Sequence, residues 1–314
     1  MRFAVTVLAS VIASCGRGAA SPAIPAPAPA PAPAPTMAPE LRDLLRSGSA
    51  LSLAGEQDSA LVIYRQALAR WPNEYNVHAG LGTIFDLLGQ FSEARQHWLQ
   101  AIAVASPQQR PGAHSQLAVS YAFECRVDDA ARAEQAAIDA RLAEGSFTAA
   151  AAVYNELARI YLECGDAERA LTAYRTGYET ALRTRALNDT ARSLWEFRWE
   201  SAQARVAVRR GQSVDAQQHV AAAKAILERG LNPDQAPFLP YLTGYVALYA
   251  GDYATAISDL GGASQTDPFV LALLARAYEK QGNIGQSDSY WRRARAINGH
   301  ALTVALARMP ATRP

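Results

Sequence analysis

A pattern of small and aromatic residues returns along this chain, and its first two copies are 34 residues apart. The first copy contains Gly48, Gly55, Ala60, Tyr64, Ala67 and Pro72, and the second contains Gly82, Gly89, Ala94, Trp98, Ala101 and, one residue late, Pro107. A fixed period of this length is typical of stacked helical hairpins, because each hairpin can bury its apolar face only against its neighbours. The period therefore predicts an all-α solenoid.

From Leu41 to about Asn298 the pattern resembles the tetratricopeptide repeat (TPR) family. The resemblance implies a right-handed superhelix of about seven units, each made of an antiparallel helix A and helix B. Small residues allow the helices to approach closely, and a glycine after helix A ends it in the left-handed conformation. The units begin at Leu41, Tyr75, Pro111, Ala151, Phe197, Pro237 and Pro268.

The spacing widens in the middle of the array, where units three, four and five begin at 111, 151 and 197. We expect the extra residues, 141–150 and 183–196, to lengthen helices. The segment Asn188-Asp189-Thr190 suits the N-cap of a long helix carrying Trp195 and Trp199. Such long helices would protrude from the solenoid. After the array, 299–314 is predicted to be a capping segment that covers the last helix.

The N-terminus has the features of an export signal, predicted here to span residues 1–14. Arg2 precedes an apolar run that is too short to cross a bilayer. The ending Ile12-Ala13-Ser14-Cys15 resembles the bacterial lipoprotein signal. That resemblance implies cleavage before Cys15 and acylation of this residue. An ordinary secretory peptide is the alternative. Gly16 stands where an Asp commonly retains such proteins at the inner membrane, so the resemblance favours the outer membrane, facing the periplasm.

Residues 15–40 contain Cys15, which the lipoprotein resemblance implies is acylated, and a linker in which proline and alanine alternate strictly from Pro25 to Pro35. Proline fixes φ and removes backbone donors, so neither helix nor sheet is expected. The low-complexity stretch from Pro22 to Pro39 is expected to form a polyproline II spacer, and about 3.1 Å per residue gives it a reach of roughly 50 Å. This linker would hold the array, 41–298, away from a membrane.

Sequence patterns for catalysis, metals and nucleic acid were not found. The formal net charge is +1 and no dense basic run occurs, which argues against a nucleic-acid partner. The five histidines occur singly, without zinc-site spacing, and His97 and His219 are expected on solvent-exposed helix faces. We therefore predict no catalytic residue, no metal and no cofactor, although an enzyme assembled from distant residues stays an alternative.

Cys125 and Cys164 fall at nearly equivalent positions of consecutive repeats, at the ends of neighbouring A helices. An oxidising periplasm would permit a disulfide between them. Packed helices are usually about 8–10 Å apart, whereas a disulfide needs α-carbons within about 7 Å. Two separate buried thiols are the interpretation favoured by this geometry.

The TPR resemblance also implies which side chains of helix A face the inner surface. Unit four places Asn155, Arg159 and Glu163 there, and unit five places Arg198, Ser201, Arg205 and Arg209. Unit six places Phe238 and three tyrosines there, and unit seven places Phe269, Arg276, Glu279 and Lys280, so a basic stripe should lie beside an aromatic one. Arg and Tyr are enriched at binding hot spots. The predicted partner-binding residues are Asn155, Arg159, Arg198, Arg205, Arg209, Tyr241, Tyr245, Tyr249 and Arg276. The alternative is that the arginines are solvated and the tyrosines pack against neighbours.

These features together predict a lipid-anchored scaffold of the bacterial envelope that binds other proteins or peptides in an Arg- and Tyr-lined groove. The groove suits an extended or helical peptide with acidic and apolar groups. The family's two-carboxylate clamp for chaperone tails is not reproduced, because Leu45 and Ser49 occupy its first positions. An envelope hydrolase built on helical repeats and a self-assembling structural subunit are the alternative functions.

Overall fold

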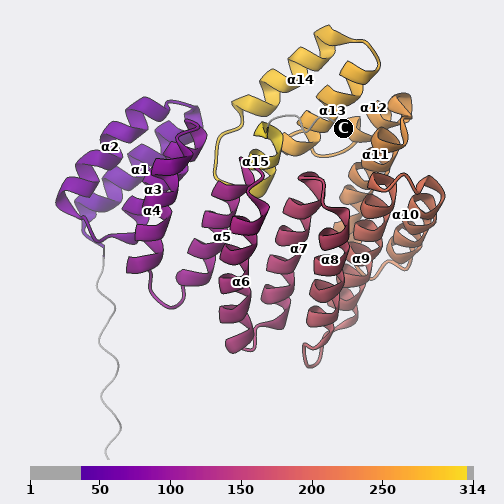
Figure 1. The fold of residues 1–314 in the computed structure, drawn as a ribbon, viewed down its shortest axis with the longest axis horizontal. Helices are drawn as coiled ribbons and strands as arrows, with labels where there is room; N and C mark the ends of the chain where they lie inside the picture. The colour runs from indigo at the N-terminus through magenta and orange to yellow at the C-terminus, as the bar shows by residue number, and fades with distance from the viewer. Residues whose placement is uncertain (1–36, 310–314) are drawn as a thin grey trace, which may run out of the picture. The chain divides into compact units, whose positions relative to one another are not determined.

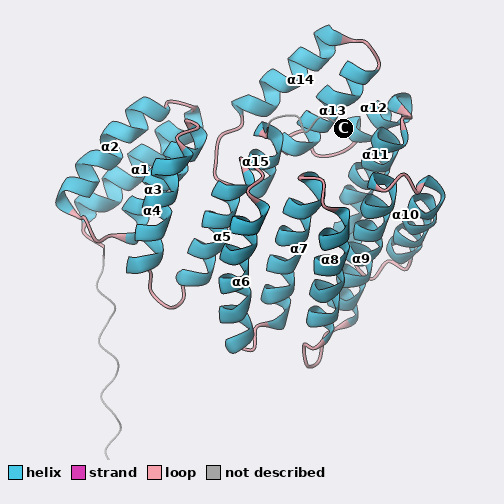
Figure 2. Ribbon diagram, viewed as in Figure 1, coloured by secondary structure: helices cyan, strands magenta, loops and turns pink. Residues whose placement is uncertain are grey.

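The computed structural model of the protein describes residues 37–309, which contain helices and no strand. Figure 1 shows these helices in chain order, and Figure 2 shows the short loops that join them. The signal sequence, Cys15 and most of the linker lie outside the described residues. Among the described residues no helix combines the length and apolarity that crossing a bilayer requires.

Fourteen of the α-helices form seven successive pairs, in which the two helices pack on each other and the second helix of each pair packs on the first helix of the next pair. The first three pairs are α1 Pro39–Ala54 with α2 Gln57–Arg70, α3 Tyr75–Leu87 with α4 Phe91–Val104, and α5 Arg110–Ala122 with α6 Val127–Ala143. The next two are α7 Phe147–Glu163 with α8 Ala167–Leu182, and α9 Asp189–Arg209 with α10 Ser213–Glu228. The 3₁₀ helix η1 Pro233–Phe238 then precedes α11 Leu239–Ala250 with α12 Tyr253–Gly261, and α13 Pro268–Lys280 with α14 Ile284–Ala296. A single short helix, α15 Leu302–Arg308, ends the described chain. The predicted solenoid of about seven hairpins is confirmed.

Glycine residues, which have no side chain, allow the two helices of a pair to approach closely. A Cβ atom added to Gly48 would lie 2.6 Å from the ring of Tyr64, and one added to Gly82 would lie 2.7 Å from the ring of Trp98. Both rings are nearly buried. The glycine of helix A therefore makes room for the aromatic residue of helix B, which is the relationship that the 34-residue spacing encodes.

The left-handed turn after helix A is also present, and in the third unit Cys125 adopts it with φ of 51°. The expectation of two separate thiols is wrong: Cys125 and Cys164 form a disulfide, and their α-carbons are 5.6 Å apart. Both residues lie just past the last turn of their helices, α5 and α7. The helix-axis spacing used in the prediction does not apply there, because the chain ends of two helices can approach more closely than their axes.

The lengthened middle of the array follows the prediction in part. Helix α9 has 21 residues, and the Asn188 side chain caps it by accepting from the backbone N–H of Ala191. The expected protrusion is wrong, since Trp195 is only 3% exposed and packs with Ala151 and Ala181. The extra turns of α9 extend the apolar core.

The C-terminal segment does more than cover the last pair. Helix α15 packs mainly on α13 and α5, with smaller contacts to α14 and α7 (Figure 1). It thus lies on the face made by the first helices of the pairs, here called the A-helix face. Part of the groove that the sequence assigned to a partner is filled by the protein's own chain.

Candidate functional site

The predicted binding residues come from four consecutive A helices: α7, α9, α11 and α13. The structure divides them into two groups. Five of the nine line one cavity of about 470 Å³, namely Asn155, Arg159, Arg198, Arg205 and Tyr241. The other four lie beyond the cavity, toward the C-terminal ends of the same helices, namely Arg209, Tyr245, Tyr249 and Arg276.

The cavity is here called the arginine pocket and is defined by Arg159, Arg198, Arg205, Tyr174, Ser201 and Tyr241. Helices α7 and α9 supply the arginines, whereas Tyr174 comes from α8 and Tyr241 from α11. The repeat pattern explains the convergence, because equivalent positions of neighbouring A helices face the same side of the array.

Several polar atoms of the arginine pocket are buried without a hydrogen-bond partner among the described residues. They are Arg159 Nε, Tyr174 OH, Ser201 Oγ and Tyr241 OH. Buried polar atoms in folded proteins are usually paired, since an unpaired one costs about 1–3 kcal/mol. Four such atoms around one cavity mark it as a place where a polar group from outside the chain would be stabilised.

Aromatic rings hold the pocket's guanidinium groups in place. The Arg205 guanidinium lies 5.2 Å from the Tyr174 ring centroid, and that of Arg159 lies 5.1 Å from the Phe269 ring centroid. Arg205 is 9% exposed, and its Nε donates to the Ser201 carbonyl oxygen at 3.2 Å. Burial lowers the pKa of Arg205, but neighbouring tyrosines and Glu163 outweigh it and shift the pKa upward. The Arg205 side chain therefore stays positively charged although it is buried.

The second group is a closed network around the buried carboxylate of Glu163, which is 3% exposed. Tyr245 donates to Glu163 Oε1 at 2.9 Å, and Arg209 donates to Glu163 Oε2 at 3.1 Å and to the Tyr245 hydroxyl at 3.2 Å. The Tyr249 ring packs against that of Tyr245 with 4.7 Å between centroids, and Arg276 lies close enough to oppose the rise in the pKa of Tyr249 that burial causes. We call these five residues the Glu163 network. Burial, and after it the Glu163 charge, holds the pKa of Tyr245 well above its ordinary value.

For Tyr245 the structure agrees with the alternative interpretation, in which this tyrosine packs against its neighbours instead of facing a partner. Tyr245 is 0% exposed, because Gly244 and the small residues around it bring α11 close to its neighbours. Arg209 and Tyr245 do meet, as the spacing predicted, yet their donors are used by Glu163. Glu163 was not among the predicted site residues. Its place at the end of helix A, like that of Arg209 one unit later, was the available signal.

The C-terminal segment forms one wall of the arginine pocket, through Ala301, Leu302 and Thr303. His300 fixes this segment, since its Nε2 lies 2.7 Å from Asp86 Oδ2 and its Nδ1 contacts Gln116 Oε1. At the other end of α15, the Met309 sulfur lies 3.2 Å from Cys125 Sγ. Sequence reasoning placed this segment at the end of the array and so missed its part in the site.

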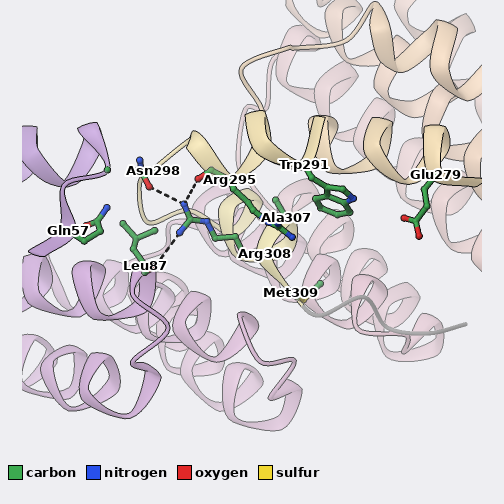
Figure 3. Close-up of a pocket in the computed structure, with 10 residues that line it drawn as sticks. Gln57, Leu87, Glu279, Trp291, Arg295, Asn298, Ala307, Arg308 and Met309 are labelled. Atoms are coloured by element: carbon green, nitrogen blue, oxygen red, sulfur yellow. Dashed lines mark hydrogen bonds between the residues drawn. The ribbon is translucent and has the colours of Figure 1, made fainter. Parts of the chain in front are cut away.

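A larger cavity of about 690 Å³ lies between the first and last pairs, and Figure 3 shows the residues that line it. Its central side chain, Arg308, donates to the carbonyl oxygens of Leu87, Arg295 and Ile297 and to Asn298 Oδ1. Asn298 in turn donates to the Leu53 carbonyl oxygen of α1. Arg308 and Asn298 therefore join the two ends of the array, which is a structural role.

The histidines are placed differently from the prediction. His97 is not simply exposed: its Nδ1 lies 3.1 Å from Nδ1 of His78, and burial, His78 and Arg65 lower its pKa to about 4. His219 Nδ1 lies 2.7 Å from Glu200 Oε2. Among residues 37–309, no group of three or more His, Cys, Asp or Glu side chains could hold a metal ion.

Comparison with known proteins agrees with the fold. Residues 151–181 match the model of the tetratricopeptide repeat family. Residues 151–181, which form α7 and α8, are thus a tetratricopeptide repeat, and the seven helix pairs give the described residues the fold of a TPR-like solenoid. Comparison of the sequence with curated proteins found no match.

Solved structures with similar folds have low sequence identity to this chain. A tetratricopeptide repeat protein from Parabacteroides merdae is 13% identical, with a TM-score of 0.50 over 86% of this chain and 98% of that one. Aspartyl phosphate phosphatase F from Bacillus subtilis is 12% identical, with a TM-score of 0.55 over 82% of this chain and 70% of that one. The apo form of RapI is 12% identical, with a TM-score of 0.54 over 81% and 96%. At these identities the likeness concerns the fold.

Proposed function

We propose that this protein is a scaffold of the bacterial cell envelope that holds a partner protein by a peptide segment bound at the arginine pocket. The observation that carries the proposal is the set of buried polar atoms without partners in one cavity of a TPR solenoid. The groups that define the cavity, three guanidinium groups and three hydroxyls, can each donate a hydrogen bond to an acceptor from outside the chain.

The N-terminal sequence supports the location. The lipoprotein-like ending Ile12-Ala13-Ser14-Cys15 would give an acylated Cys15, and Gly16 favours the outer membrane. The proline–alanine linker would then separate the array from the lipid surface, leaving the pocket accessible to partners in the periplasm.

Two experiments test the two parts separately. Photo-crosslinking from Phe238, which is 54% exposed at the pocket, should capture a specific partner in intact cells. The control position is Val214, which is 72% exposed on α10 and outside the pocket. Identical adduct patterns from both positions would overturn the scaffold proposal.

The lipid anchor is tested with Cys15→Ser, which should release the folded protein from membranes. Retention of this variant in the membrane fraction after a high-salt wash would refute the anchor.

A further inference from the structure

The donor atoms of the arginine pocket have one chemical property in common: each can donate a hydrogen bond to an acceptor placed in the cavity. Arg159 Nε is donor-only, and Tyr174, Ser201 and Tyr241 present hydroxyl groups without partners among the described residues. A group rich in acceptor oxygens would satisfy several of them at once. A hydrocarbon group would leave all of them unpaired.

The charge of the pocket points to the same kind of ligand. None of Arg159, Arg198 and Arg205 forms an ion pair within residues 37–309, although other arginines of the chain do. The acidic group on the cavity wall is Glu156, which is exposed. Two carboxylates outside the lining act on the arginines, Asp267 on Arg159 and Glu163, which is already paired with Arg209, on Arg205. Three guanidinium groups against one lining carboxylate leave an excess of positive charge, and guanidinium groups fit carboxylate and phosphate oxygens.

An apolar wall accompanies the charged one. Phe197, Leu242 and Leu302 line the cavity, and the ring of Phe238 is more than half exposed beside it. An exposed aromatic ring next to a polar pocket suits a ligand whose charged group is flanked by an apolar one. A free inorganic ion would contact only the arginine and hydroxyl groups of the cavity and leave its apolar wall uncovered.

We infer that the arginine pocket recognises an oxyanion that carries an apolar neighbour, and that this ligand is an acidic segment of a partner protein with its carboxylate among Arg159, Arg198 and Arg205. This inference rests on the proposed scaffold function and names its ligand. The apolar side chain of the segment would lie against Phe238, at the open side of the cavity.

The test is calorimetric titration of the purified protein, lacking residues 1–14 and carrying Cys15→Ser, with acetyl-Glu-Glu-Phe-Leu-amide. Acetyl-Gln-Gln-Phe-Leu-amide has the same shape without charge and should bind at least about tenfold more weakly. Phenyl phosphate and inorganic phosphate are the arms that separate a peptide carboxylate from a phosphate source. Binding of the acidic peptide should weaken as salt is raised.

Three variants locate the binding. Ser201→Ala and Tyr241→Phe each remove an unpaired hydroxyl, so folding should be kept while affinity falls by about threefold to tenfold. Arg198→Gln should lower affinity by more than tenfold. Arg192→Gln is the matched control, because Arg192 is an exposed arginine on the same helix, and it should leave affinity unchanged.

The outcomes separate this inference from the scaffold proposal. Equal affinity for the Glu and Gln peptides, or no binding of any probe, overturns the oxyanion inference even if Phe238 crosslinks a partner. Binding of phenyl phosphate that depends on Ser201, without binding of the peptide, keeps the oxyanion but overturns the acidic segment as its source. Binding that is equally weakened by Arg192→Gln overturns the pocket as the site.

Discussion

His300 Nε2 lies 2.7 Å from Asp86 Oδ2, although the two residues are 214 positions apart in the chain. Asp86 is 2% exposed and also accepts from Ser120 Oγ at 2.7 Å and from Trp98 Nε1 at 3.0 Å. The His300 ring packs on Trp98 with 4.8 Å between centroids. The segment after the last repeat is thus held by a polar contact inside the second unit.

We expect His300→Ala to destabilise the protein by about 2 kcal/mol, because a buried carboxylate loses one of its partners. The loss should be accompanied by faster amide exchange in α15 and in the C-terminal half of α3. His114→Ala is the control, since His114 is half-buried on α5 and its side chain has no hydrogen bond among the described residues. Unchanged exchange in α15 would contradict the anchoring role of His300.

The repeats were predictable because Gly48 with Tyr64 and Gly82 with Trp98 are local pairs, close in sequence and repeated at a fixed period. Contacts across the array have no such signal. Nothing in the pattern around His300 indicates Asp86 as its partner, and nothing around Glu163 shows that Tyr245 is buried against it. The pocket residues were found by their repeat positions, whereas their division into an open pocket and a closed network depends on three-dimensional packing.

The disulfide should contribute substantially to stability. Cys125 and Cys164 are separated by 39 residues, and closing a loop of this size in the unfolded chain corresponds to about 3–4 kcal/mol. Cys125→Ser with Cys164→Ser should therefore lower the melting temperature by several degrees, and reductant should do the same to the unmodified protein. A count of two free thiols from this pair, on denatured and unreduced protein, would contradict the disulfide.

Glu134 should make stability fall as pH rises. Burial, with help from Glu156, raises the pKa of Glu134 from 4.5 to about 8, and the hydrogen bond from Ser115 only partly opposes this. Between these two pKa values the folded protein binds a proton that the unfolded chain lacks, so the stabilisation present below pH 4.5 is lost progressively up to about pH 8.

Glu134→Gln, which keeps the shape without the charge, should be about 1–3 kcal/mol more stable than the parent at pH 8 and little different at pH 4.5. Denaturant titrations at the two pH values measure this difference. Parallel pH profiles for the two proteins would contradict an ionisable Glu134 in the core.

Tyr241 and Tyr245 lie one helical turn apart on α11, with ring centroids 6.0 Å from each other, and their hydroxyls have different environments. Tyr245 donates to Glu163, whereas the Tyr241 hydroxyl is buried without a partner among the described residues.

Tyr245→Phe should cost about 1–2 kcal/mol of stability and change peptide affinity little. Tyr241→Phe should leave stability unchanged or slightly raised, yet weaken binding of the acidic peptide. Melting curves and titrations on the same two preparations give both readouts. Because the substitution is identical in the two variants, a loss of affinity in Tyr245→Phe rather than in Tyr241→Phe would place the ligand at the Glu163 network instead of the arginine pocket.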